Sequence, residues 1–312
     1  MAHTNAEIMN RISYLDTLKG FLMLVVVAHH VPYYALSYYH CENEFFASFM
    51  VVREFVYMPY FMTAFFVCTG MCSNFDKPFA DFARGVVKIA IPSYLILRHT
   101  QWFIDAFILS KLLYWLVNKY VSNRYLKFAV VLALAALGCV LHGDRFFYEA
   151  YAWHHGLTML LFIYIGQHLK EFLTDKRYIL AATIAYVVLA LVCFLFWADI
   201  PYFEKVFHVS YITFVPFVVI SLCGVMMTIG IAKLIDNRLL QFIGKRSLVF
   251  FLMHLVILRY LIPRFMGLVN GTNGNLLASA LLFVLIWLVV SALCLLVAKL
   301  LDHPNLKWLV GK

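Results

Sequence analysis

Long apolar runs follow one another along the whole chain, and no other feature constrains the fold as strongly. A helix needs about 20 apolar residues to cross a hydrocarbon layer roughly 30 Å thick, and the runs lack the two-residue alternation of membrane-barrel strands. Of the 312 residues, 64% are hydrophobic and 13% are charged, whereas about a quarter are charged in soluble proteins.

The sequence therefore predicts an all-α integral membrane protein. We expect a single bundle of ten transmembrane helices, which forms one domain over residues 1–312. The predicted helices occupy about 18–37, 46–72, 84–98, 101–118, 126–142, 154–169, 177–197, 209–232, 246–263 and 276–299.

Lysine and arginine fall mainly in alternate connections between the predicted helices. One set of connections holds most of these residues, and the other set holds only Arg98, Arg145, Lys205 and Arg264. Cytoplasmic loops carry the excess of Lys and Arg, so both termini are predicted to be cytoplasmic. Treating 84–118 as one helix would reverse every later loop and destroy the asymmetry, so this segment is predicted to be two helices. The net charge of +9 is explained as an orientation signal, and no motif supports nucleic acid as a partner.

The first predicted helix carries two ionisable side chains in its apolar run, Lys19 and His30. At about 1.5 Å per residue the imidazole lies roughly 16 Å beyond the ammonium group, near the middle of the membrane. Ionisable side chains at this depth usually face a cavity or a partner. His30 is therefore a candidate general base, and the alternative is a histidine satisfied by a neighbouring helix.

The second predicted helix contains Arg53 and Glu54 in an otherwise apolar run, followed by Pro59. Adjacent side chains on a helix do not face each other. Each charge is therefore expected to find a partner on another helix, either in a structural ion pair or at a functional site. Pro59 is expected to kink or open the helix, and such irregular backbone is tolerated in a membrane where it is buried or lines a cavity.

Arg84 and Lys88 lie four residues apart at the predicted cytoplasmic edge, so they share one helix face. With Lys19 they form a candidate basic mouth for a phosphorylated cytoplasmic ligand. The alternative is that these are ordinary side chains whose charged ends reach the membrane surface.

Two further histidines are candidate acceptor-binding residues. His154 opens the sixth predicted helix from the outer side, where a simple interfacial position is the alternative. His254 lies seven residues after Ser247, a candidate helix cap, and enters the membrane from the same side as His30. Two intramembrane histidines of this kind predict a shared polar interior. The seven cysteines show no ligand spacing, so no metal site is predicted.

A set of short motifs, in order along nearly the whole chain, resembles the membrane-bound acyltransferase-3 family, the O-acetylases of surface sugars and related molecules. The matching residues are Lys19 and His30 in a basic-x10-His pattern, Met58-Pro59-Tyr60-Phe61, Thr69-Gly70, Lys88, Pro92, Tyr94, Ile243-Gly244, Ser247-Leu248, His254 and the C-terminal segment 304–312.

The resemblance implies acetyl-CoA or another acyl-CoA as a donor that binds from the cytoplasm. It also implies an acceptor hydroxyl on a sugar or glycan at the outer face of a bacterial-type inner membrane. His30 is then expected to act as the general base or to carry the acyl group briefly.

The cations take supporting roles in this hypothesis. Lys19, Arg84 and Lys88 are expected to hold the CoA phosphates. Arg53 or Glu54 is expected to orient His30 or to stabilise the oxyanion.

A multi-helix transporter of a small polar solute is the alternative function. The ionisable residues that would form its relay are His29, His30, Glu54, Asp105, His254 and Arg259. No internal repeat, which many carriers show, is visible in the sequence. A third reading is a family member that has lost catalysis and serves as a scaffold.

Overall fold

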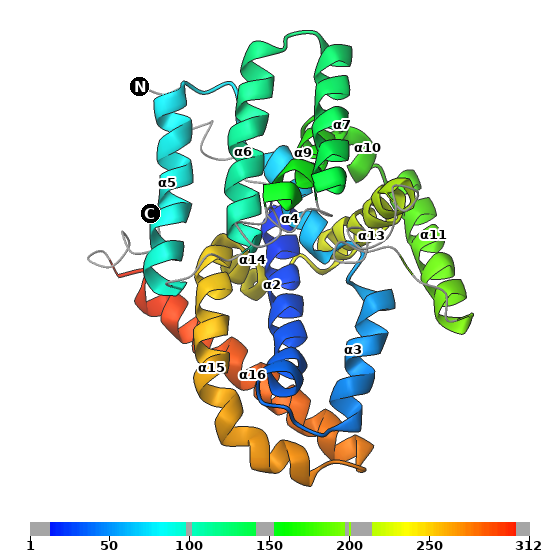
Figure 1. Ribbon diagram of the computed structural model, residues 1–312, viewed down its shortest axis with the longest axis vertical. Coiled ribbons are helices and arrows are strands. Elements are labelled where there is room, and N and C mark those ends of the chain that lie inside the picture. Colours follow the sequence, from blue (N-terminus) through cyan, green and yellow to red (C-terminus); the bar gives the residue numbers. More distant parts are fainter. Residues whose placement is uncertain (1–12, 98–101, 142–152, 197–199, 201–213, 304–312) are drawn as a thin grey trace.

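The computed structural model describes residues 13–97, 102–141, 153–196, 200 and 214–303, and the regular structure in these residues is entirely helical (Figure 1). The elements are α2 (Ser13–Tyr33), η1 (Tyr34–Tyr38), α3 (Glu44–Val56), α4 (Phe61–Cys72), α5 (Phe79–Leu97), α6 (Trp102–Tyr120), α7 (Arg124–Leu141), α9 (Trp153–His168), α10 (Lys170–Thr174), α11 (Lys176–Leu195), α13 (Phe214–Ile235), α14 (Arg238–Lys245), α15 (Ser247–Gly271) and α16 (Leu276–Leu300).

Helix α2 lies at the centre of the bundle. It packs against α3, α4, α13, α14, α15 and α16, and Figure 1 shows it among them. Apolar side chains along its length, such as Leu18, Leu22 and Val27, are fully buried. The polar side chains of α2 are therefore directed to other protein groups or to a cavity rather than to lipid.

Two glycines bring α2 and α14 into backbone contact. A Cβ atom at Gly20 would overlap the carbonyl oxygen of Leu240, and one at Gly244 would overlap the carbonyl oxygen of Asp16. Small residues allow helix backbones in a membrane to approach this closely. Because α14 leads directly into α15, the contact also fixes where α15 begins relative to α2.

Helices α4 and α9 meet in the same way. A Cβ atom at Gly70 would overlap the carbonyl oxygen of Ile163, and one at Gly166 would overlap that of Val67. The reciprocal contact holds α4 against α9, which in turn packs against α6 and α7.

Helices α3 and α4 are two parts of one apolar segment, bent by 42° relative to each other. The prediction of a single helix over 46–72 is therefore wrong, and the break falls at residues 57–60, around Pro59. Proline lacks the N–H that would continue the helical ladder, so the expected opening occurs at this residue.

The carbonyl groups freed by this break have partners. The hydroxyl group of Ser221 donates to the carbonyl of Pro59 at 2.5 Å, and that of Tyr186 donates to the carbonyls of Phe55 and Val56 at 3.1 and 3.2 Å. Unpaired backbone groups are costly in hydrocarbon, so side chains from α11 and α13 make the break tolerable at this depth.

Helix α2 ends in a π turn. Pro32 removes one backbone N–H from the last turn of α2, and the chain continues as η1. The N–H of Tyr39 donates to the carbonyl of Tyr34 at 3.3 Å, which is the i to i+5 spacing of a π-helix. The turn stacks the rings of Tyr34 and Tyr38 with their centroids 4.8 Å apart.

The described chain contains six helical segments long and apolar enough to cross a membrane, or seven if the bent α3–α4 pair is one span. These segments are the α2–η1 unit, α7, α11, α13, α15 and α16. Large apolar side chains such as Leu195 and Leu281 are exposed on their outward faces, where lipid would cover them. The protein is therefore a multi-pass membrane protein.

The number of crossings and the position of the termini stay predictions. A helix occurs within each of the ten predicted intervals, but fewer spans meet the length and apolarity criteria in the described residues. Figure 1 shows α5 and α6 as two separate helices side by side, as the division of 84–118 requires. The connections that hold Arg98, Arg145 and Lys205 lie outside the described residues, as does the segment 304–312.

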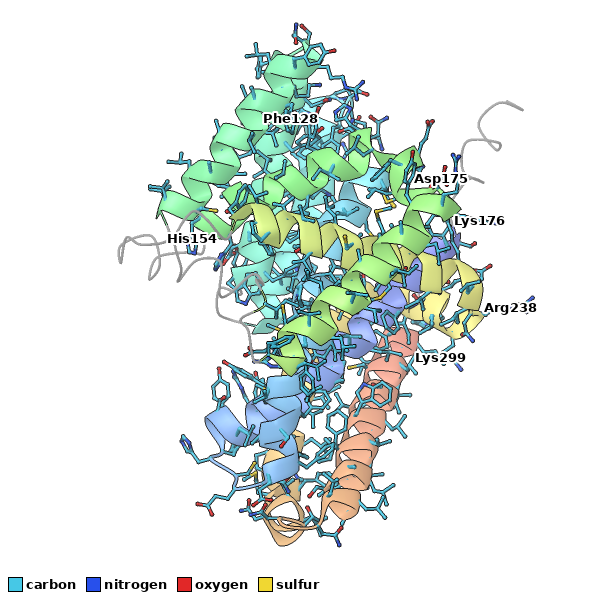
Figure 2. The ribbon with its side chains drawn as sticks, turned by 90° about the vertical axis from the view of Figure 1, so that its right-hand side faces the viewer. Phe128, His154, Asp175, Lys176, Arg238 and Lys299 are labelled. Atoms are coloured by element: carbon cyan, nitrogen blue, oxygen red, sulfur yellow. The ribbon has the colours of Figure 1, made fainter. Side chains whose placement is uncertain are left out.

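In Figure 2, three basic residues predicted for the cytoplasmic side, Lys176, Arg238 and Lys299, lie on the right of the view, whereas His154, predicted for the outer side, lies on the left. The orientation of the bundle in the membrane stays a prediction from the charge pattern.

Gly244→Ala is expected to lower stability, because the added methyl group would overlap the Asp16 carbonyl and force α14 away from α2. Overpacking typically costs about 1–3 kcal/mol, so the melting temperature in detergent should fall by several degrees. The matched control is Gly267→Ala in α15, where nothing lies within 4 Å and the better helix propensity of alanine should leave stability equal or slightly higher. Equal melting temperatures for the two variants would contradict the close approach.

Candidate active site

A cavity of about 230 Å³ lies where α2, η1, α3, α4, α6 and α15 converge, and we call it the histidine cavity. Its lining residues are Val26, His29, His30, Tyr33, Tyr34, Tyr38, Arg53, Met58, Phe61, Met62, Trp102, Phe103, Phe251, His254, Leu255 and Arg259. The lining is largely aromatic with a few polar groups, which is typical of small-molecule sites.

His30 and His254 lie beside each other in this cavity, with their ring centroids 4.9 Å apart. Nδ1 of His30 lies 2.8 Å from the carbonyl oxygen of Val26, and Nδ1 of His254 lies 2.9 Å from that of Phe250. A carbonyl oxygen can only accept, so in each ring Nδ1 carries a proton, and in the neutral imidazole Nε2 is then the acceptor. Each ring is therefore oriented so that its neutral form can take up a proton at Nε2.

The two histidines differ in exposure. His254 is fully buried, and its Nε2 has no hydrogen-bond partner among the residues that the structure describes. A buried acceptor without a partner is costly, and a ligand that donates a hydroxyl group at this point would remove that cost. His30 is only partly buried, so it is the more accessible of the two from the cavity.

Arg53 reaches from α3 to His29 on α2. Its Nη1 lies 2.7 and 2.8 Å from the two ring nitrogens of His29, and its Nε donates to the carbonyl of Met50 at 3.0 Å. Because a guanidinium only donates, only the unprotonated nitrogen of the neutral His29 ring can accept from it, and the other nitrogen carries the ring proton. The rings of His29 and His30 are 4.8 Å apart, so Arg53 fixes the neighbour of the candidate base rather than the base itself.

The histidine cavity is positively charged. Arg53 and Arg259 are its cations, and the described lining contains no Asp or Glu. At one end the lining includes Tyr38, which is 58% exposed, and Arg259, which is also exposed, so this end reaches the protein surface. The cavity is suited to a ligand that develops negative charge, because preorganised cationic donors stabilise such charge strongly in a low dielectric.

A second cavity of about 130 Å³ adjoins the first, and we call it the apolar cavity. Its lining residues are Met23, Phe65, Ile89, Phe103, Ile104, Phe107, Ser247, Leu248 and Phe251. Phe103 and Phe251 line both cavities, and their ring centroids lie 5.0 Å apart.

The sequence-predicted site residues fall into two groups. His30, Arg53 and His254 all line the histidine cavity. Glu54 and His154 line neither cavity: Glu54 follows Arg53 on α3, and His154 is buried on α9 with its ring 3.9 Å from that of His155.

The three predicted phosphate-binding cations do not line either cavity. Lys19 Nζ lies 2.8 Å from the buried carboxylate of Asp16, within the first turns of α2. Arg84 is 70% exposed and pairs with Asp81 at 3.1 Å, and Lys88 is exposed one turn further along α5. A phosphate group held by these cations would therefore lie at the protein surface next to the cavities, and not inside them.

Sequence reasoning assigned no part in acyl transfer to several lining residues. Tyr33, Tyr34 and Tyr38 are placed around the cavity by the π turn, whose signal in the sequence is only Pro32. Trp102 and the phenylalanines come from segments that read as ordinary membrane helix. The adjacent pair His29-His30 was the available signal for His29.

These features define a multi-pass membrane protein with a polar, base-containing cavity inside the bundle. A family model described as an acyltransferase domain (Acyl_transf_3) matches residues 99–301, about two thirds of the chain. The chain therefore belongs to the acyltransferase-3 family. No curated protein and no solved structure gives a significant match.

The matched range divides the site. His254, Phe251 and Arg259 lie within it, whereas His30 and Arg53 belong to helices that precede it. The structure brings the two parts together in one cavity.

Diethyl pyrocarbonate, which modifies unprotonated imidazole, is expected to label the histidines in an order set by exposure. The exposed His303 should react first, His30 should follow through the surface end of the cavity, and His254 should react last because it is fully buried. Peptide mass spectrometry at successive times would measure the order. Labelling of His254 as fast as that of His303 would contradict the described geometry.

Proposed function

We propose that the protein is an acyl-CoA-dependent O-acyltransferase, with acetyl as the expected group and a sugar or glycan hydroxyl as acceptor. The observation that carries the proposal is the juxtaposition of His30 and His254, each with Nε2 free to accept a proton, in one polar cavity. Membership of the acyltransferase-3 family supports acyl transfer as the reaction.

His30 is the general base in this proposal. Its Nε2 takes the proton of the acceptor hydroxyl while the hydroxyl oxygen attacks the thioester carbonyl carbon. A C–O bond forms, the C–S bond breaks, and the CoA thiolate leaves. The imidazolium then returns the proton to the thiolate, which gives the free thiol and a neutral His30. His254 cannot take the same proton along this path, because it is fully buried, whereas His30 is partly open to the cavity.

The oxyanion of the tetrahedral intermediate needs a donor in the same cavity. Arg53, which lines the cavity and is held against His29, is the candidate, and a positioned donor of this kind typically contributes about 10²–10³ in rate. Glu54 keeps only its predicted role of orienting a neighbouring group.

The acceptor occupies the histidine cavity and enters from its surface end. Tyr33, Tyr34 and Trp102 give broad apolar faces with polar edges, which suit the alternation of C–H and O–H groups on a sugar ring. Nε2 of His254 accepts a hydrogen bond from a second hydroxyl group of the same sugar. This bond would supply the partner that the buried nitrogen lacks among the described residues. His154 does not line this cavity, so an acceptor role for it would require a larger ligand that reaches α9.

The donor binds from the cytoplasmic side of a bacterial-type inner membrane, and the whole chain acts as one domain. Lys19, Arg84 and Lys88 carry the positive charge for its phosphates. Exposed cations with one local partner remain free to contact phosphate, since surface ion pairs are weak.

His30→Gln is expected to reduce acyl transfer from acetyl-CoA by about 10²–10⁴-fold, because loss of a general base has this effect. The protein should still fold and bind acetyl-CoA, which the melting temperature and a binding isotherm would show. His303→Gln, at an exposed position outside the cavity, is the matched control and should retain full activity. Wild-type turnover by correctly inserted His30→Gln protein would eliminate the assigned role.

Arg84→Glu is expected to weaken acetyl-CoA binding about tenfold, or about 1.4 kcal/mol, because it replaces attraction to phosphate with repulsion. The effect should shrink at high salt, which screens exposed charges. Arg177→Glu is the matched control, since Arg177 is also exposed and pairs with a nearby aspartate, Asp175, at 3.0 Å. Equal affinities for the two variants, measured by titration calorimetry, would remove Arg84 from the donor site.

A further inference from the structure

The apolar cavity lies beside the predicted cytoplasmic cations. Its lining residue Ile89 directly follows Lys88 on α5, and Met23 lies one turn after Lys19 on α2. On α15, its lining begins at Ser247, directly after Lys245 and Arg246. Three of the helices that line the cavity therefore carry basic residues at its predicted cytoplasmic end.

The two cavities follow each other along the same helices. On α2 the lining passes from Met23 in the apolar cavity to His30 in the histidine cavity, and on α15 it passes from Leu248 to His254. On α6, which runs the other way, Phe107 lines only the apolar cavity. On all three helices the residues nearer the predicted cytoplasmic end line the apolar cavity, and those further from it line the histidine cavity. The cavities are therefore consecutive chambers along one line through the bundle.

Two aromatic side chains, Phe103 and Phe251, belong to the linings of both chambers. The rings of Phe103 and Phe251 contact each other, and the ring of Phe251 lies 5.7 Å from that of His254. Both rings are largely buried. A side chain changes rotamer far more readily than a packed helix shifts, so this wall is the part of the structure that can open with the least rearrangement.

We infer that the apolar cavity is the binding site for the pantetheine arm of the acyl-CoA, and that Phe103 and Phe251 form a partition through which the thioester reaches His30. The inference rests on the proposed acyl transfer and assigns the donor's path within it. The occupant must combine an anionic end, for the cations, with a narrow uncharged arm, for a cavity whose lining is apolar except for Ser247. An acyl-CoA has both parts.

The partition also protects the donor from water. The histidine cavity reaches the surface and contains a base, so water there is placed to attack a thioester. In that reaction water adds to the carbonyl carbon, the C–S bond breaks, and acetate and CoA thiol are released. Closed rings keep the thioester carbon in the apolar cavity until an acceptor fills the histidine cavity.

The test is acetyl-CoA hydrolysis without an acceptor, measured as release of CoA thiol from purified protein. Phe103→Ala and Phe251→Ala are expected to raise the rate about tenfold, which corresponds to about 1.4 kcal/mol off the barrier. Phe217→Ala is the matched control, because it removes the same atoms from a fully buried position on α13 that lines neither cavity. Phe251→Leu provides a milder variant in case the alanine variants are poorly folded.

Binding of acetyl-CoA distinguishes the outcomes. If every variant binds acetyl-CoA with the affinity of the wild type but Phe103→Ala and Phe251→Ala hydrolyse it no faster than Phe217→Ala, the partition is overturned while acyl transfer stands. If the wild type neither binds nor cleaves acetyl-CoA, the proposed function fails and the inference fails with it. Loss of the added hydrolysis in Phe251→Ala with His30→Gln would support the path to His30.

Discussion

The backbone contact between α2 and α14 at Gly20 and Gly244 is the constraint on which the site depends. Ten positions separate Gly20 from His30, and ten separate Gly244 from His254. His30 lies on the same helix as Gly20, roughly 15 Å further along at about 1.5 Å per residue. His254 lies on α15, which begins directly after α14, so the contact also positions the start of the helix that carries this ring. The two rings lie 4.9 Å apart.

The second organising constraint is that polar groups inside a membrane must have partners. Backbone carbonyls satisfy Nδ1 of His30 and of His254, and this leaves Nε2 of each ring as the reactive atom. The hydroxyl group of Ser221 on α13 satisfies the carbonyl of Pro59, and that of Tyr186 on α11 satisfies the carbonyls of Phe55 and Val56. The same rule thus makes the chemistry of the site specific and allows the α3–α4 break that borders it.

The sequence was most informative where a rare residue stands in an apolar run. His30, Arg53 and His254 were predicted for this reason, and the structure brings all three to one cavity. Phe103 and Phe251 could not be predicted, because any of the 29 phenylalanines of the chain reads equally as core or lipid-facing. The basic mouth was predicted from a shared helix face, and the structure shows Lys19 held by Asp16, an i,i+3 pair on one helix that the sequence spacing also indicates. Local sequence does not show that Arg84 and Lys88 line neither cavity, because that depends on packing.

The break at Pro59 turns one membrane-length segment into two short rods that meet at a joint. One of these, α4, lines both chambers, through Met62 in one and Phe65 in the other. A small tilt of α4 about the joint would change the widths of both chambers together. A ligand bound in one chamber would then change the width of the other chamber by moving α4. This coupling needs no row of charged side chains between the two chambers.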